Sequence, residues 1–298
     1  MSALVSLPAP LVPVSDVHVH ADGLDHPEGV TTGPDGCVWA GGELGQVYRV
    51  DPSTQEVREL ARAGSLALGI VVDGLGSAYT CNPVTRSVDV FSPTGEHRTY
   101  ARWPEGQEIV GCNHLVFDAA GCLYVSDSGH DGVDDGRIYR VAPGGQAEIW
   151  CDALRTCPNG VCLAPDGSAL YVAMSFRPGR ICRVEIRDDG SAGAVEDYVQ
   201  LDGLVPDGLA FAENGDLYVA TYRPDAVLIV RAFSRQVDVL AHDPLGQLLA
   251  SPTNIAFASH EGAPCLLVAN IGRWHIARIP VAVRGAELHH PTAAGLGF

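Results

Sequence analysis

Short segments in which apolar and polar residues alternate, bounded by Gly, Pro and Asp, run along most of the chain and predict β-strands. The first full set predicts four strands, at residues 29–34, 37–42, 45–52 and 56–62. Asp35 and Gly36 are turn residues between the first two strands. Because this pattern returns along the chain, we predict an all-β protein built from repeated four-stranded units.

Six copies of one strand–turn–strand motif can be aligned, and each contributes one residue to an equivalent position. These residues are Glu28, Leu68, Asn113, Asn159, Asp207 and Asn254, with spacings of 40, 45, 46, 48 and 47 residues. A period in the forties with four strands per repeat is typical of β-propellers. We therefore predict an all-β, six-bladed β-propeller with four-stranded antiparallel blades. It forms a single domain, 1–298, with blades starting near residues 27, 68, 112, 158, 206 and 253.

The sixth copy has too few residues to complete its blade. Residues 14–22 (VSDVHVHAD) precede the first blade and alternate like a strand. We predict that they supply the outer strand of the last blade, which closes the ring without an open edge between first and last blades.

The equivalent residues are predicted to share one mouth of the central channel, because the first strand of each blade lines that channel. Glu28, Asn159 and Asp207 bring two carboxylates and an amide oxygen to this mouth. Such oxygen donors bind hard divalent cations, and carboxylates placed together without a cation repel each other. The alternative is that these groups bond backbone amides or channel water.

The turns between second and third strands, and the links between blades, return to the same mouth. They bring Trp103 and the ranges 128–136, 176–179, 222–224 and 273–275 to the rim. Residues 128–136 form the longest of these hairpin turns and are a candidate lid. The rim residues that we consider for substrate binding, or alternatively as exposed polar or packing residues, are His130, Arg177, Tyr222 and Trp274.

Composition narrows the class of protein. The net charge of −17 argues against a nucleic-acid partner, which requires a basic face. Apolar runs are too short to predict a membrane span, and the N-terminus lacks the basic region of a signal peptide. Nine cysteines are an odd number without zinc-type spacing. Cys37 and Cys122 occupy the same slot and are expected to be small buried residues, so a reducing cytoplasm fits best.

The segments PEGV, PNGVCLAPDGSALYVA and PDGLAFAENGDLYVA resemble the SMP-30/gluconolactonase/LRE-like six-bladed propellers. The resemblance extends from about Asp16 to about Pro280. It implies that Glu28, Asn159 and Asp207 hold one divalent metal ion, with Asn113 beside it, touching substrate or metal. Calcium is the preferred ion, and zinc, manganese, magnesium and iron are alternatives. The activity implied is lactone hydrolysis, although relatives hydrolyse phosphotriesters or, in the strictosidine-synthase branch, perform condensations.

The implied mechanism uses the metal as a Lewis acid that polarises the lactone carbonyl and stabilises the tetrahedral oxyanion. Asp207, adjacent to the metal, is the candidate general base for the attacking water. Asn254, the counterpart in the sixth blade, is either a fourth ligand, an amide that orients a metal-bound water, or a cap for loop backbone.

One departure from the family pattern concerns the substrate. Sugar-lactone members carry Arg-x-Asn-Asp around the third-blade Asn, whereas residues 111–114 here read Gly-Cys-Asn-His. Leu68 is also apolar. Both changes favour a less hydroxylated lactone or an ester as the small-molecule substrate. His114 has three open roles: substrate contact, proton donor, or packing residue.

His18 and His20 form an HxH pair, which marks zinc sites in some hydrolases. Here both lie on the predicted outer strand, far from the channel axis, so metal binding there is disfavoured. The leading hypothesis is a metal-dependent lactonase. The alternatives are a phosphotriesterase-like or other hydrolase using the same site, and a propeller that binds a metal or partner without catalysis.

Overall fold

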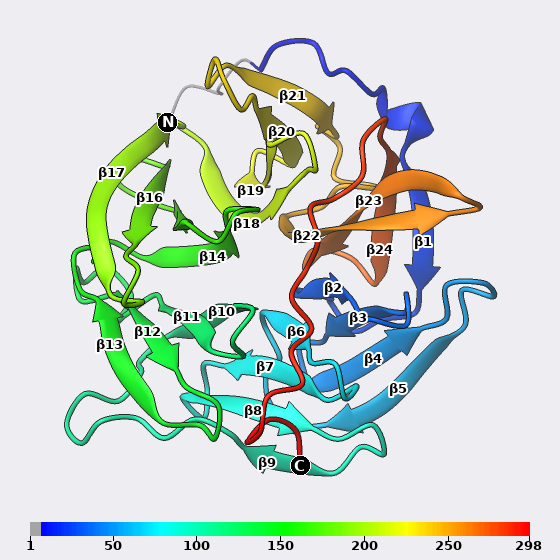
Figure 1. The fold of residues 1–298 in the computed structure, drawn as a ribbon. Coiled ribbons are helices and arrows are strands. Elements are labelled where there is room, and N and C mark those ends of the chain that lie inside the picture. The colour runs from blue at the N-terminus through cyan, green and yellow to red at the C-terminus, as the bar shows by residue number, and fades with distance from the viewer. Residues whose placement is uncertain (1–6) are drawn as a thin grey trace.

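The computed structural model describes residues 7–298, so the first six residues of the predicted domain 1–298 lie outside it. Six four-stranded antiparallel sheets stand around a central axis like blades (Figure 1). The predicted six-bladed β-propeller is therefore confirmed. In each blade, the first strand of the repeated motif lines the channel, and the other strands lie progressively farther out.

The strands follow the predicted repeat closely. Blade one has β2 (Val30–Thr32), β3 (Val38–Gly41), β4 (Gln46–Val50) and β5 (Val57–Arg62). Blade two has β6 (Ile70–Val72), β7 (Ala78–Asn82), β8 (Ser87–Phe91) and β9 (His97–Thr99). Blade three has β10 (Cys112–Phe117), β11 (Leu123–Asp127), β12 (Arg137–Val141) and β13 (Ala147–Cys151).

The remaining blades are longer-stranded. Blade four has β14 (Pro158–Leu163), β15 (Ala169–Met174), β16 (Arg180–Ile186) and β17 (Ala192–Gln200). Blade five has β18 (Val205–Phe211), β19 (Leu217–Arg223), β20 (Ala226–Val230) and β21 (Val237–His242). Blade six has β22 (Pro252–His260), β23 (Ala263–Asn270), β24 (His275–Pro280) and β1 (His18–Asp22).

The ring is closed by its N-terminal strand, as predicted. β1 pairs antiparallel with β24 and is the outer strand of blade six. The preceding residues, Val14–Asp16, form a short 3-10 helix, η1, so only the second part of the predicted segment 14–22 is a strand. Blade six thus combines strands from both ends of the propeller, and the backbone hydrogen bonds between β1 and β24 hold the ring closed.

Aromatic rings pack between neighbouring blades. Tyr79 of blade two meets Phe117 of blade three edge to face, with ring centroids 5.1 Å apart. The pair Tyr171 and Phe211 repeats this contact between blades four and five at 4.9 Å. Buried edge-to-face pairs stabilise a fold by about 0.5–1.5 kcal/mol beyond their area burial. Tyr218 and Phe257 form a third such pair between blades five and six at 4.9 Å, so equivalent positions of the repeated motif produce similar interfaces.

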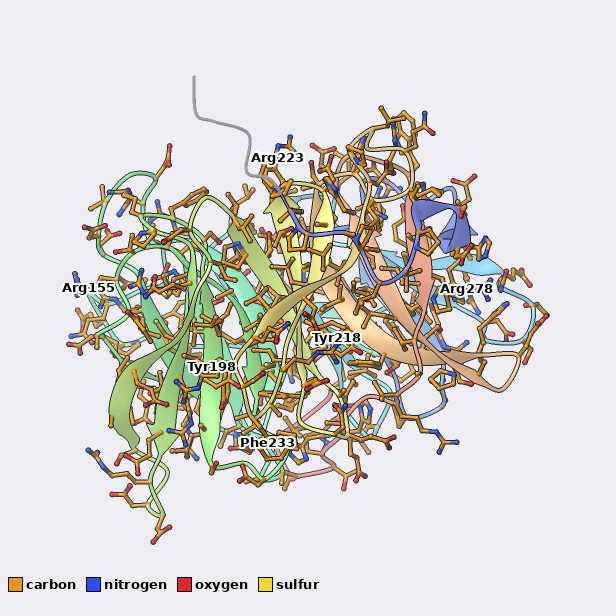
Figure 2. The ribbon with its side chains drawn as sticks, turned by 90° about the horizontal axis from the view of Figure 1, so that it is seen from above. Arg155, Tyr198, Tyr218, Arg223, Phe233 and Arg278 are labelled. Carbon is orange, nitrogen blue, oxygen red and sulfur yellow. The ribbon has the colours of Figure 1, made fainter. Side chains whose placement is uncertain are left out.

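The channel has two mouths, which we call the upper mouth, where inner strands begin, and the lower mouth, where they end. In Figure 2, Arg223 and Phe233, from consecutive turns of blade five, lie at opposite faces of the molecule. The C-terminal segment, residues 284–298, crosses the ring in front of its centre in Figure 1. Its backbone bonds Phe211 O through Ala286 N at 2.8 Å and Gly74 N through Pro291 O at 2.8 Å.

The C-terminal segment therefore covers the lower mouth, a role that strand patterning did not predict. A cavity of about 560 Å³ lies in the channel, bounded by His114 and Asn254 on the upper side and by residues 284–290 on the lower side. All nine cysteines are free thiols, and Cys37 and Cys122 are buried as expected. Across residues 7–298, no helix is long and apolar enough to cross a membrane.

Candidate metal centre

Glycines follow four of the six equivalent residues and bring their inner strands unusually close together. A Cβ atom added to Gly160 would overlap the carbonyl oxygen of Asp207, and one added to Gly29 would overlap that of Leu68. A Cβ on Gly208 would lie 2.7 Å from Asn254 Cα. Because glycine has no side chain, these strands can approach until their backbones touch. The Glu-Gly, Asn-Gly and Asp-Gly pairs of the motif thus gather the equivalent residues at the upper mouth.

Glu28 and Asp207 place two carboxylates in a buried site. Their exposed fractions are 6% and 5%. Burial, and then the negative charge of Asp207, raise the pKa of Glu28 well above its usual value. Burial also raises the pKa of Asp207, while a hydrogen bond from Asn159 opposes this. Two desolvated carboxylates that disfavour each other's charge need a compensating cation to be stable in ionised form.

Four oxygen atoms at the equivalent positions find no hydrogen-bond partner among residues 7–298. We call these the open oxygens, and they are Glu28 Oε2, Asn113 Oδ1, Asn159 Oδ1 and Asp207 Oδ1. Buried polar atoms are nearly always satisfied, so four unsatisfied acceptors from one ring of residues require an explanation. All are oxygen acceptors, which is the donor chemistry of a hard divalent cation site. The residues predicted to hold a metal therefore fit one.

Hydroxyl groups fix the backbone beside these residues. Ser175 Oγ donates to Pro206 O at 2.8 Å, next to Asp207, and Thr253 Oγ1 donates to Glu28 O at 2.7 Å. Ser128 Oγ donates to Pro158 O at 2.8 Å, next to Asn159. Each hydroxyl comes from a neighbouring blade, so the blades are tied together at the level of the site. Sequence reasoning placed Ser128 in the rim range 128–136 but did not predict Ser175 or Thr253, nor any of these backbone contacts.

His114 and Asn254 form a bridge across the channel. They belong to blades three and six, which face each other, and His114 Nε2 lies 3.1 Å from Asn254 Oδ1. The backbone N–H of Val161 donates to His114 Nδ1 at 3.3 Å. Burial lowers the pKa of His114 to about 4. Both ring nitrogens are thus engaged with the protein, and the neutral ring separates the upper site from the cavity below.

The rim residues lie at the upper mouth, as predicted, and their side chains contact residues of their own or neighbouring rim loops. His130 Nδ1 contacts Asp135 Oδ2 at 2.6 Å within residues 128–136, and Arg177 reaches Asp134 of that loop at 3.6 Å. Arg223 stacks on Tyr222, with its guanidinium carbon 4.8 Å from the ring centroid. Leu68 is half-buried. These contacts brace the rim, and whether the loop 128–136 acts as a lid stays a prediction.

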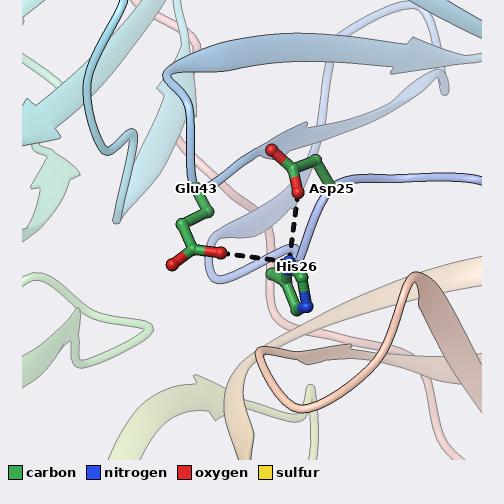
Figure 3. Close-up of side chains that lie close together, drawn as sticks. All are labelled: Asp25, His26 and Glu43. Carbon is green, nitrogen blue, oxygen red and sulfur yellow. Dashed lines mark hydrogen bonds and ion pairs between the residues drawn. The ribbon is translucent and has the colours of Figure 1, made fainter.

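A cluster at the same mouth was not predicted. His26 Nδ1 lies 3.0 Å from both Asp25 Oδ1 and Glu43 Oε2 (Figure 3). It is the only group of three His, Cys, Asp or Glu side chains with metal-ligand spacing within the described part of the chain. The His26 ring packs against Trp274, with centroids 5.4 Å apart. Gln46 Nε2 donates to Asp25 Oδ2 at 2.8 Å, so the cluster braces blade one against the rim turn of blade six.

The HxH pair lies on β1, away from the channel, as predicted. His18 is exposed, whereas His20 is only 4% exposed and sits where the strand bulges. The ring of His20 meets His260 edge to face at 5.9 Å.

One known protein family matches the part of the chain that contains the six motif copies. A family model described as the SMP-30/Gluconolactonase/LRE-like region matches residues 27–269. The chain belongs to this family. None of the curated protein sequences compared with it matches significantly.

Solved structures share the fold of this SMP-30/gluconolactonase family member. A gluconolactonase from Xanthomonas campestris is 18% identical, with a TM-score of 0.75 and coverage of 89% of each chain. A calcium-binding protein, regucalcin, from Agrobacterium tumefaciens is 17% identical, with a TM-score of 0.74. That match covers 95% of this chain and 99% of the regucalcin chain. At these identities the likeness shows the fold alone.

Proposed function

We propose that this protein is a metal-dependent lactonase whose site is the upper mouth of the channel. The observation that carries the proposal is the set of four open oxygens, buried and contributed by separate blades. Membership of the SMP-30/gluconolactonase family and the fold shared with a gluconolactonase support the reaction class. The fold shared with a calcium-binding regucalcin supports calcium as the ion.

In this proposal, Glu28, Asn159 and Asp207 hold the ion, and Asn113 lies beside it. A divalent cation bound there supplies Lewis acidity, which polarises a lactone carbonyl. Asp207 accepts a proton from the attacking water as the water oxygen bonds to the carbonyl carbon. The carbon–oxygen bond of the ring then breaks, and the ring oxygen takes up a proton to give a hydroxy acid. Burial of the site excludes competing water from the carboxylates.

The lining supports a substrate with few hydroxyl groups. Leu68 is apolar, and His114 stands where sugar-lactone relatives carry Asp. Both ring nitrogens of His114 already bond to protein atoms, so the ring has no free donor or acceptor for a sugar hydroxyl. We therefore propose a less hydroxylated lactone or ester as the substrate.

The test is a pH-stat screen of sugar-derived and apolar lactones, using metal-stripped protein with single metals added back. We expect acid release restored by calcium, faster with apolar lactones, and reduced at least about a thousandfold in Asp207→Asn through loss of the base and a ligand. Asp166→Asn, in an exposed turn of blade four at the lower mouth, is the matched control and should retain activity.

Other outcomes would redirect the assignment. Stoichiometric calcium binding with no release from any lactone would contradict the lactonase and direct the screen to phosphotriesters. Absence of metal binding would contradict the metal centre itself. Loss of activity in both Asp207→Asn and Asp166→Asn would show that the measurement reports folding rather than chemistry.

A further inference from the structure

The proton on His114 can be placed from its hydrogen bonds. A backbone N–H is always a donor, so the 3.3 Å bond from Val161 N makes Nδ1 an acceptor without a proton. An imidazolium carries a proton on both nitrogens, so a ring that accepts a hydrogen bond at Nδ1 is neutral. A neutral imidazole carries one proton, which must therefore reside on Nε2. His114 is a hydrogen-bond donor toward blade six.

This donor determines which way the amide of Asn254 points. The atom 3.1 Å from His114 Nε2 must be an acceptor, so it is Oδ1 rather than Nδ2. The amide nitrogen is then turned away from His114. Asn254 is only 2% exposed, and its Nδ2 has no hydrogen-bond partner within the part of the chain that the structure describes. A buried NH₂ group is therefore available to an acceptor that the protein does not supply.

Asn159 provides the opposite case in the same ring. The hydroxyl of Ser175 donates to the carbonyl of Pro206, so its oxygen accepts from Asn159 Nδ2 at 3.1 Å. That bond leaves Asn159 Oδ1 as an open oxygen. Two equivalent asparagines thus present different atoms: Asn159 an oxygen, and Asn254 a nitrogen. An amide nitrogen carrying two protons has no lone pair for a cation, and the Oδ1 of Asn254 is already engaged by His114, whereas the Oδ1 of Asn159 is open.

Asn254 stands between the two carboxylates of the site. Its strand, β22, packs between β18, which carries Asp207, and β2, whose start is preceded by Glu28. A Cβ added to Gly208, next to Asp207, would lie 2.8 Å from Asn254 Oδ1. On the other side, the neighbouring Thr253 bonds the carbonyl of Glu28.

We infer that Asn254 is a hydrogen-bond donor to the carbonyl oxygen of the substrate rather than a fourth metal ligand, and that His114 positions its amide. The inference rests on the proposed lactonase function and assigns a residue that stabilises negative charge on that oxygen. Removing one preorganised donor to an oxyanion slows hydrolysis about a hundredfold to a thousandfold.

The experiment compares Asn254→Ala with Asn159→Ala, its counterpart that presents oxygen. Calcium affinity is measured by isothermal titration calorimetry on metal-stripped protein, and kcat and KM on the best lactone of the screen. We expect Asn254→Ala to keep calcium affinity within about threefold while kcat falls about a hundredfold or more. Asn159→Ala is expected to lose at least about tenfold in calcium affinity.

A second measurement needs no variant of Asn254. A long-range ¹H–¹⁵N NMR spectrum of the wild-type protein reports which imidazole nitrogen of His114 carries the proton. We expect the proton on Nε2. His114→Phe, which removes the donor, should lower kcat while leaving calcium affinity unchanged, and His114→Gln, which restores a donor, should recover part of the loss.

The inference is overturned if Asn254→Ala weakens calcium binding as Asn159→Ala does, if it leaves kcat unchanged, or if the His114 proton lies on Nδ1. Should no lactone be hydrolysed, the proposed function fails separately. Calcium affinity in Asn254→Ala and the His114 tautomer still decide whether Asn254 is a donor or a ligand.

Discussion

The orientations of two asparagine amides in this propeller are fixed by hydrogen bonds to groups that can only donate or only accept. Carbonyls only accept and backbone N–H groups only donate, so bonds anchored on Pro206 O and Val161 N fix Asn159 and Asn254 in opposite orientations. The carboxylates of Glu28 and Asp207 have no backbone N–H donor of this kind in the described chain, and a hydrogen bond from Asn159 supports the charge of Asp207. Their raised pKa values, caused first by burial, mark the site as unfavourable for the bare protein.

His20 is another buried titratable residue whose burial costs folding free energy. Neither of its ring nitrogens has a hydrogen-bond partner in the described chain. Burial, and then the charge of Arg278, lower the pKa of His20 below its ordinary value of 6.5. The folded state therefore holds the ring neutral, while the unfolded state protonates it as pH falls below about 6.5.

We expect the His20 contribution to decrease stability as pH falls below 6.5, by up to about 1.4 kcal/mol per pH unit within its window. His20→Phe should flatten this dependence and leave stability at pH 8 unchanged or higher, because no unsatisfied nitrogen is buried. Urea denaturation between pH 5 and 8 measures the effect. His18→Phe, on the exposed part of the same strand, is the control, and equal slopes for both variants would refute the assignment.

At the scale of strands, the site depends on how closely neighbouring inner strands approach. β14 and β18 touch at Gly160, where an added Cβ would meet only backbone atoms of Asp207 and Gly208. Backbone atoms cannot turn aside as a flexible side chain does, so the two strands would have to separate. Separation would move Asn159 away from Asp207.

Gly160→Ala is therefore expected to lower the free energy of unfolding by about 2–3 kcal/mol and to weaken calcium binding at least about tenfold. Gly167→Ala is the matched control from the same blade. It has a φ of +71° and no described atom within 4 Å of an added Cβ, so it should cost only about 1 kcal/mol and leave calcium affinity unchanged. Similar results for both variants would contradict a role for the close approach.

At the scale of the whole molecule, the two ends of the chain close different parts of the propeller. β1 completes blade six, and the C-terminal segment covers the lower mouth. That segment bonds blades five, two and three, including Gly297 N to Tyr79 Oη at 2.6 Å and Gly144 N to Gly295 O at 3.0 Å. It therefore ties blade five to blades two and three, which are not its neighbours in the ring.

Deleting residues 284–298 is expected to open the channel cavity from below while leaving the upper site intact. Loss of the backbone bonds should lower the free energy of unfolding by about 3–5 kcal/mol, at about 1 kcal/mol for each bond. Fluorescence of a dye that binds apolar surface should rise, and calcium affinity should stay the same. Phe233→Ser, at a fully exposed side chain on the same face, is the control. Unchanged stability and dye binding after truncation would contradict the covering role.

The sequence alone determined the number of blades, their strand order, the ring closure by β1, and the mouth at which Glu28, Asn159 and Asp207 gather. These follow from strand alternation and a repeat period, which are local properties of the chain. The orientations of the Asn159 and Asn254 amides did not follow, because an asparagine looks the same in sequence whichever atom it presents.

Only the tertiary structure decided the orientations of Asn159 and Asn254. The orientation of Asn254 depends on His114, 140 residues earlier, and that of Asn159 on a hydroxyl bonded to blade five. The Asp25–His26–Glu43 cluster and the cover formed by residues 284–298 likewise arise from contacts between separate blades. Hydrogen-bond direction is set by neighbours in space, and neighbours across a propeller channel are distant in sequence.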